Sequence, residues 1–289
     1  MGIEEFKIIF DRHDRTYFAG EVLKGQISIR LNSEERFDNI KVELNGGAFV
    51  SWKEFADIDI KQKKGNKQKH EVEVLDQEYT NQENYILSQQ MVKNGPSLKA
   101  GSHMLPFHFI LSNNLPSSFD SEAGQVRYFV KAHMEKGSGQ SENPTTLEQV
   151  MILGALDLNG RQEALNKAHA EDNKMLGCLC MATGPINAQL SLGRTGYVPG
   201  EKIDFSAEVE NLSDKRMESS SLELVQIVTY KGKPVTDPEK VLRNTHSNYV
   251  ETKTKTVTKV MQEVKRGPIE TRGTDNWEGS VIEVVLFGL

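Results

Sequence analysis

One five-residue phrase occurs twice in the chain, 180 positions apart, and each copy opens a stretch with the alternation of a β-strand. Tyr17–Glu21 (YFAGE) and Tyr197–Glu201 (YVPGE) share a tyrosine, a glycine and a glutamate. The glycine can adopt the positive φ that a tight turn needs. Apolar or small residues then occupy every second position in residues 23–31 and 203–209, which is the period of a strand with one buried face. The repeat predicts one turn-and-strand unit in each of two similar β-domains.

The rest of the chain also has the pattern of strands separated by turns. Alternating apolar residues recur in residues 105–111 and 126–132, and the first half of the chain has no long amphipathic helix. This favours an all-β sandwich over an α/β fold. Residues 157–174 are polar and alanine-rich, which is typical of an interdomain linker with one helical turn. We therefore predict sandwiches over residues 1–156 and 175–289, joined by that linker.

Composition and charge exclude several classes of protein. The length of 289 residues suits two domains, since one domain commonly takes about 100–200 residues. A net charge of −6 argues against nucleic-acid binding, which usually needs a basic face. No apolar run approaches the ~20 residues that span a bilayer, and the N-terminus lacks the layout of a signal peptide. With only two cysteines, no disulfide framework is expected, and the predicted compartment is the cytoplasm.

The chain shows no constellation of catalytic, metal-binding or cofactor-binding residues. Its seven histidines have no metal-ligand spacing such as H-E-x-x-H. No glycine-rich segment leads from a strand into a lysine-bearing helix, as a phosphate loop would require. Catalysis should leave convergent titratable residues or an exposed nucleophile. We predict that the protein is not an enzyme and that it uses neither cofactor nor metal.

A cluster of lysines is the sharpest charged feature. Residues 58–74 predict a long hairpin with Gly65-Asn66 at its tip, whereas Asn45-Gly-Gly47 is interpreted as a strand breaker. Several ammonium groups together attract multivalent anions such as a phosphorylated tail or an anionic lipid headgroup. The alternative is a solvated loop kept soluble by its charge. The candidate anion-binding residues are Lys61, Lys63, Lys64, Lys67 and Lys69.

The two cysteines lie two positions apart, in Cys178-Leu-Cys180. Reversible palmitoylation is one hypothesis for this pair. The alternative is that both side chains point to the inner face of one strand, where cysteine behaves as a small apolar residue.

Besides the repeated phrase, the chain contains an ordered series of short motifs that resembles the sequence of a known family. After the first Y-x-x-G-E phrase come Leu115–Phe119 (LPSSF), Gly124–Ala132 (GQVRYFVKA), Gly184–Ile186 (GPI), Glu208–Ser213 (EVENLS) and Trp277–Gly279 (WEG). This series resembles the α-arrestins, the arrestin-domain-containing proteins, particularly those of invertebrates. The resemblance implies two tandem arrestin-type, immunoglobulin-like β-sandwiches. It also implies an adaptor that binds the cytoplasmic tails of membrane receptors and transporters, and links them to endocytic sorting and ubiquitin-dependent trafficking at the plasma-membrane and endosome periphery.

Three departures from the family narrow this expectation. The strand at residues 147–153 has no basic residue, and Arg127 stands where visual and β-arrestins tend to have an acidic one, so no phosphate-triggered polar core is expected. The nine prolines are never adjacent, so the Pro-Pro-x-Tyr motif that docks on ubiquitin ligases is absent from this sequence. The segment between Trp277–Gly279 and the last expected strand is shorter than in the family. We therefore expect that the second sandwich lacks a strand or that the sequence is a truncated or alternative form.

Two other functions remain open on the sequence. One is a stable scaffold subunit that resembles the arrestin-like subunit of retromer and does not contact cargo. The other is an extracellular adhesion sandwich, which the lack of a signal peptide and of disulfides disfavours. Association at fixed stoichiometry would favour the scaffold, and weak, salt-sensitive binding of tails would favour the adaptor.

Overall fold

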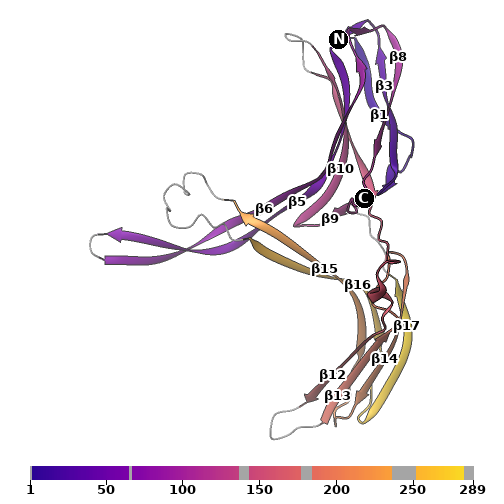
Figure 1. The fold of residues 1–289 in the computed structure, drawn as a ribbon. Coiled ribbons are helices and arrows are strands. Elements are labelled where there is room, and N and C mark those ends of the chain that lie inside the picture. The colour runs from indigo at the N-terminus through magenta and orange to yellow at the C-terminus, as the bar shows by residue number, and fades with distance from the viewer. Residues whose placement is uncertain (1, 65–66, 137–142, 177–183, 236–251, 283–289) are drawn as a thin grey trace. The chain divides into compact units, whose positions relative to one another are not determined.

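The computed structural model describes residues 2–64, 67–136, 143–176, 184–235 and 252–282, and for residues 56–75 it describes the backbone alone. The described chain is built of β-strands, with a single short 3-10 helix at Gln162–Leu165 (Figure 1). No helix in these ranges is long and apolar enough to cross a membrane. The expected all-β class is confirmed.

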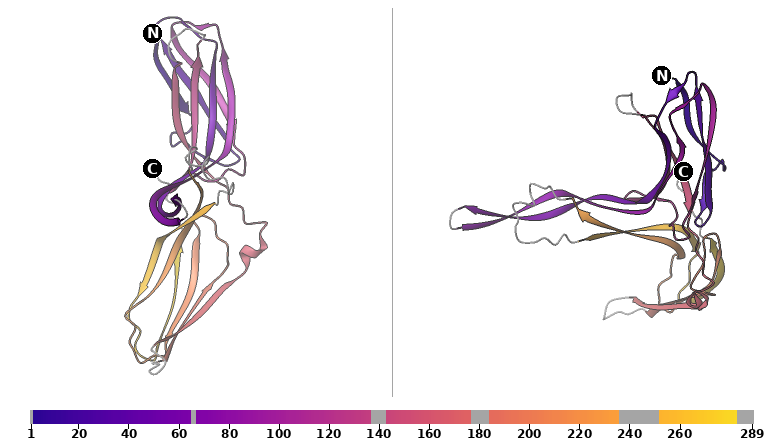
Figure 2. Two further views of the ribbon diagram at one scale, coloured as in Figure 1. Left: turned by 90° about the vertical axis from the view of Figure 1, so that its left-hand side faces the viewer. Right: turned by 45° about the horizontal axis from the view of Figure 1, so that its top comes forward.

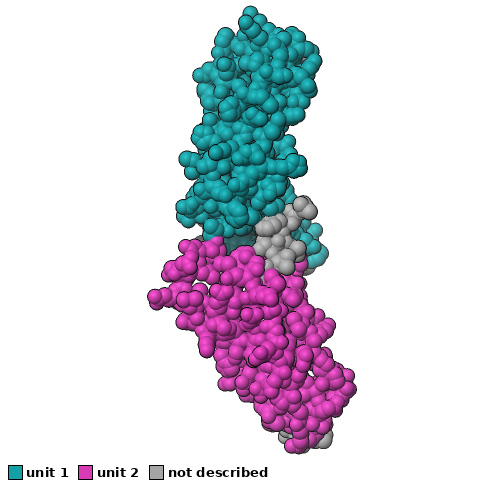
Figure 3. Space-filling model, turned by 90° about the vertical axis from the view of Figure 1, so that its right-hand side faces the viewer, with its two compact units in different colours: residues 1–155, 230–255, 287–289 teal, residues 156–229, 256–286 magenta. Residues whose placement is uncertain are grey.

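The chain divides into two compact units, coloured separately in Figure 3. The first contains residues 1–155, 230–255 and 287–289, and the second contains residues 156–229 and 256–286. The first unit thus includes a segment from late in the sequence. The boundaries predicted above for the two sandwiches stay a prediction.

The first unit is a sandwich of two sheets. One sheet has the antiparallel order β1 (Ile3–Phe10), β3 (Val22–Leu31), β8 (Gly101–Ile110). The other has the order β6 (Lys67–Asn94), β5 (Asn39–Lys64), β10 (Gly124–Glu135), β11 (Thr145–Leu153), β2 (Thr16–Phe18), and β9 (Phe119–Asp120) also pairs with β10. A two-stranded sheet joins β4 (Glu35–Arg36) to β7 (Ser97–Leu98).

The core of the first unit lies between its two main sheets. Burial alternates along β10, where every second side chain from Tyr128 to Met134 is buried. The same alternation places Leu23, Ile27 and Ile29 of β3 in the core. Each of these strands buries its apolar face between the sheets and exposes the other face. The period-two pattern of the sequence therefore explains the two-layer arrangement.

The second unit contains a four-stranded antiparallel sheet. Its order is β12 (Ala168–Leu176), β13 (Gly184–Leu192), β14 (Lys202–Asn211), β17 (Gly273–Ile282). Neighbouring strands β15 (Ser220–Pro234) and β16 (Lys253–Arg266) contribute Leu222, Leu224 and Val264 to its core. These side chains pack on a cluster that includes Phe205 and Trp277, whose rings meet edge to face at 5.1 Å.

The second half of the expected linker is a strand. Residues 157–174 include the predicted helical turn, as the 3-10 helix, but also most of β12, which pairs along its length with β13. The side chains of β12 are almost all exposed, so no apolar alternation marks it. Backbone hydrogen bonds to a neighbour can hold such an edge strand without a buried face, and the sequence pattern missed it for that reason.

The glycine pair in Asn45-Gly-Gly47 does not break its strand. β5 runs through it, with a shift of register between Gly46 and Gly47. A Cβ at Gly46 would collide with the Tyr128 ring, and one at Gly47 would collide with the Glu83 carbonyl oxygen. The glycines therefore permit a bulge and a close approach of neighbours, and the predicted breaker is corrected to a bulge within one long strand.

Candidate binding surfaces

The first Y-x-x-G-E phrase forms a tight turn fastened by its own side chains. Glu21 accepts hydrogen bonds from the Arg12 guanidinium at 2.8 Å and from the Phe18 amide at 2.9 Å, and these bonds lower the pKa of Glu21. Tyr17 is fully buried and donates its hydroxyl to Asp11 at 2.6 Å. Burial and this bond raise the pKa of Tyr17, so that it stays a neutral donor. The phrase is a structural turn.

The second phrase repeats this geometry in the other unit. Glu201 accepts a hydrogen bond from the Val198 amide at 2.8 Å and pairs with Arg194 at 2.9 Å, which lowers the pKa of Glu201. Arg194 lies over the Tyr197 ring at 4.5 Å, as Arg12 lies over that of Tyr17 at 4.9 Å. The second phrase is likewise a structural turn.

The long hairpin of β5 and β6 carries the predicted lysine cluster (Figures 1 and 2). The backbone register brings the five positions to one end of the hairpin, where Lys64 pairs with Lys67 and Lys61 with His70. The side chains of Lys61, Lys63, Lys64, Lys67 and Lys69 lie outside the described residues. The predicted hairpin is confirmed, and its binding of anions stays a prediction.

The other predicted pair of residues lies outside the described ranges. Cys178 and Cys180 both fall in residues 177–183, between β12 and β13. Their palmitoylation stays a prediction.

Some distance from the hairpin tip, the edge of β6 pairs with a segment from late in the sequence. Within the first unit, Lys233 and Pro234 of β15 pair antiparallel with Thr80 and Tyr79. The Val235 amide then donates to the Glu78 carbonyl at 2.8 Å. The β6 edge is therefore a place where extended backbone binds by strand addition.

Aromatic side chains line the place where this segment lies. Trp52 and Tyr79 stack at 5.4 Å, and both are buried. A Cβ at Gly232 would lie only 2.7 Å from the Trp52 ring, so the added backbone lies flat against the indole. Lys253 covers the Tyr79 ring and pairs with Glu54 at 2.5 Å. The hydrogen bond from Lys253 lowers the pKa of Glu54.

Two strongly exposed apolar side chains lie on the same pair of strands. Phe55 of β5 is 80% exposed and Leu87 of β6 is 81% exposed. Leu87 lies on β6 itself and Phe55 lies opposite Asp76 of β6, so the two residues flank the positions of β6 that pair with β15. Large apolar side chains this open to water suit contact with a partner. Sequence patterns did not single them out, because an apolar residue in a strand gives no sign of which face it occupies until the register is known.

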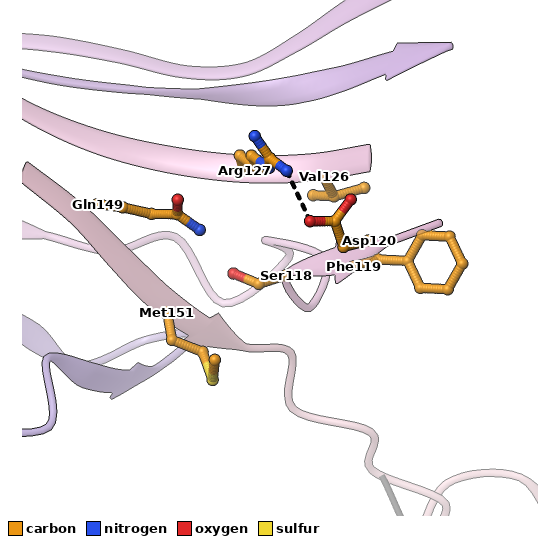
Figure 4. A pocket seen from close by; sticks show the side chains of 7 residues that line it. All are labelled: Ser118, Phe119, Asp120, Val126, Arg127, Gln149 and Met151. Carbon is orange, nitrogen blue, oxygen red and sulfur yellow. Dashed lines mark hydrogen bonds and ion pairs between the residues drawn. The ribbon is translucent and has the colours of Figure 1, made fainter. Parts of the chain in front are cut away.

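A small pocket surrounds Arg127 (Figure 4). Its guanidinium donates to Asp120 of β9 at 2.6 Å, while its Nε is buried without a partner. The pocket volume of about 20 Å³ leaves room for roughly one water molecule. Arg127 is thus paired within its own unit, with an acidic residue that the sequence analysis did not identify. The lining residues are Ser118, Phe119, Asp120, Val126, Arg127, Gln149 and Met151.

Metal-binding geometry is also absent where the structure can be described. Within the described ranges, no three histidine, cysteine, aspartate or glutamate side chains gather as metal ligands would. The groups that do converge are aromatic rings, backbone edges and ion pairs.

Comparison with known proteins matches most of the chain to two domain models of one family. The family model for the arrestin (or S-antigen) N-terminal domain matches residues 6–159, and that for the C-terminal domain matches residues 182–284. Arrestin domain-containing protein 17 of Caenorhabditis elegans is 27% identical over 98% of this chain and 62% of its own length. Human arrestin domain-containing protein 5 is 29% identical over 76% of this chain and 60% of its own. The chain thus spans less than two thirds of the length of each of these relatives.

Proposed function

Because the chain belongs to the arrestin family, with N-terminal and C-terminal domain models matching in order, we propose that it is a non-enzymatic adaptor. In this proposal it works in the cytoplasm and at the periphery of the plasma membrane and endosomes. It binds the cytoplasmic tails of membrane receptors or transporters and directs them to endocytic sorting. A scaffold built of rigid strands with open edges suits the holding of other molecules.

The β6 edge carries this proposal, because it already holds one extended segment. Residues 230–235 bind there through backbone pairing and through the Gly232 contact with Trp52. Backbone hydrogen bonds supply affinity in strand addition, and side-chain pockets supply specificity. A cargo tail would use the same mode along the unpaired remainder of β6, beside Leu87 and Phe55.

Lysines at the end of the hairpin would attract tails that carry acidic or phosphorylated residues. Opposite charges on two partners speed their encounter and set its register more than they strengthen the final complex. Binding should therefore weaken with added salt. The link to ubiquitin-dependent trafficking belongs to the same proposal, and it requires a contact other than a Pro-Pro-x-Tyr motif, since this sequence has no adjacent prolines.

The test is capture of membrane proteins from detergent-solubilised cell membranes. The chain with Lys63→Glu, Lys64→Glu and Lys67→Glu should capture fewer receptors and transporters than the unchanged chain. A matched control reverses three exposed lysines of the second unit, Lys174, Lys202 and Lys215, and should capture as many as the unchanged chain.

Three outcomes would each contradict one part of the proposal. Undiminished capture by the hairpin variant would remove the lysines from the proposal, and unchanged binding to anionic liposomes would remove a lipid contact there. Recovery of the chain only at fixed stoichiometry in one salt-resistant complex would identify a scaffold subunit instead.

A further inference from the structure

Strand β16 has a long unpaired edge in the second unit. Its neighbour on one side is β15, and no described strand pairs with it on the other. Every residue from Thr256 to Val260 is exposed. Val257 and Val260 remain 40% and 49% exposed, although β-branched residues pack well on a neighbouring strand. An edge with free backbone groups is a template for a further strand.

The charges on this edge are self-complementary about Met261. When two β16 strands pair antiparallel with Met261 at the centre, Lys259 of one copy lies opposite Glu263 of the other, and this contact occurs twice. Lys259 takes part in no ion pair between described residues, while Glu263 contacts only the exposed Lys265 of its own strand. No lysine faces a lysine in this register, since the other pairs are Val260 with Gln262, Thr258 with Val264, Val257 with Lys265, and Thr256 with Arg266.

We propose that two copies of this chain pair through their β16 edges around a two-fold axis at Met261. Such an interface uses the same surface on both copies, so it closes as a dimer and does not propagate into a filament. Cross-strand pairs of opposite charge stabilise the register, and like charges directly opposite oppose it. The added strand also covers the exposed side chains of Val257 and Val260.

Another edge of the same unit, that of β12, has a different character. β12 exposes a row of charged and polar side chains, and none of the residues 169–174 is apolar apart from Ala170. Edges of this kind discourage the addition of a strand. This contrast favours the β16 edge over the β12 edge for self-association.

Sedimentation equilibrium of the full chain over a wide concentration range tests the proposal. The unchanged chain should show a reversible monomer–dimer equilibrium. Lys259→Glu and Glu263→Lys each place two pairs of like charges across the interface, and each should weaken dimerisation about tenfold. Lys174→Glu on β12 makes the same change of charge on the other edge, and should leave dimerisation unchanged.

Mixing the two interface variants gives the sharpest result. An equimolar mixture of Lys259→Glu and Glu263→Lys should form a heterodimer with the affinity of the unchanged chain, because both contacts again join opposite charges. Circular dichroism checks that each variant is folded. A chain that stays monomeric at every concentration, single variants that dimerise normally, or a mixture that fails to associate would each overturn the proposal.

Discussion

The two copies of the Y-x-x-G-E turn have the same internal contacts and different surroundings. Gly20 and Gly200 adopt nearly the same φ, 88° and 86°. In the first copy the side chain of Asn113 closes over Gly20, whereas nothing lies within 4 Å of a Cβ built at Gly200. Tyr17 is fully buried, and Tyr197 stays partly exposed. The comparison teaches that the local sequence specifies the turn, while neighbouring strands decide how much the turn stabilises its unit.

The hydrophobic cores of the two units also differ, and again more side chains are buried in the first unit. Among the described residues, the core cluster of the first unit contains 22 buried apolar side chains. That of the second unit contains four, namely Phe205, Ala207, Trp277 and Val281. Burial of apolar area is the largest favourable contribution to folding. We therefore expect the first unit to be the more stable, and the following substitutions test this difference.

The largest effect is expected from truncation in the first core. Leu44→Ala leaves a cavity among fully buried neighbours and should destabilise the first unit by about 3 kcal/mol. Leu224→Ala, at a partly buried position of the second unit, should cost about 1 kcal/mol. Hydrogen exchange resolved by peptide measures each unit separately. Equal losses would contradict the difference between the two cores.

A pair of buried polar side chains, Asn211 and Ser213, stabilises the second unit. Asn211 is fully buried and donates to the carbonyls of Lys215 and Glu270 at 2.8 and 3.1 Å, while its Oδ1 accepts from Ser213. Asn211→Ala should destabilise this unit by about 2 kcal/mol, because buried partners lose their hydrogen bonds.

Two further variants sharpen the test of Asn211. Asn211→Asp keeps the acceptor for Ser213 but loses both donors, so it should also destabilise. Asn187→Ala removes a partly exposed bond to Glu210 and should change stability little.

A smaller effect is expected from the two tyrosines of the repeated turn. Tyr17→Phe removes the bond to Asp11 in a buried site and should cost about 1 kcal/mol. Tyr197→Phe, at a partly exposed position, should change stability by less than about 0.5 kcal/mol. Thermal unfolding of both variants supplies the measurement, and a greater loss in Tyr197→Phe would reverse the comparison of the turns.

Acidification should change stability least of these tests, and it should lower the stability of the first unit more than that of the second. Hydrogen bonds and ion pairs lower the pKa of five glutamates there, Glu5, Glu21, Glu35, Glu54 and Glu135, and of Glu201 alone among the described residues of the second.

A lowered carboxylate pKa stabilises the folded state above the unfolded value and loses this contribution as the pH falls through the folded value. Stability of the first unit should therefore decline more steeply below about pH 4.5. The five carboxylates are only partly buried, so salt should reduce the difference. Hydrogen exchange of each unit as a function of pH measures it, and a steeper decline in the second unit would contradict this assignment.

The candidate binding surface was only partly predictable. The hairpin and its lysines follow from alternation around Gly65-Asn66, which is local information. The added segment at residues 230–235 and its contact with Trp52 do not, because strand addition is a backbone contact between distant parts of the chain. The Arg127–Asp120 pair was missed for a related reason, since the β9–β10 register decides which side chains meet.

The sequence by itself determined the two turns, the all-β class and the buried face of strands such as β3 and β10. Each depends on a φ that glycine permits or on a period of two, and both are properties of a few consecutive residues. Tertiary structure alone decided that β5 bulges at Gly46–Gly47, that β12 is an edge strand, and that residues 233–235 pair with part of the β6 edge. Those outcomes depend on which backbone donors find which acceptors, and a pairing partner far along the chain leaves no mark on the local pattern.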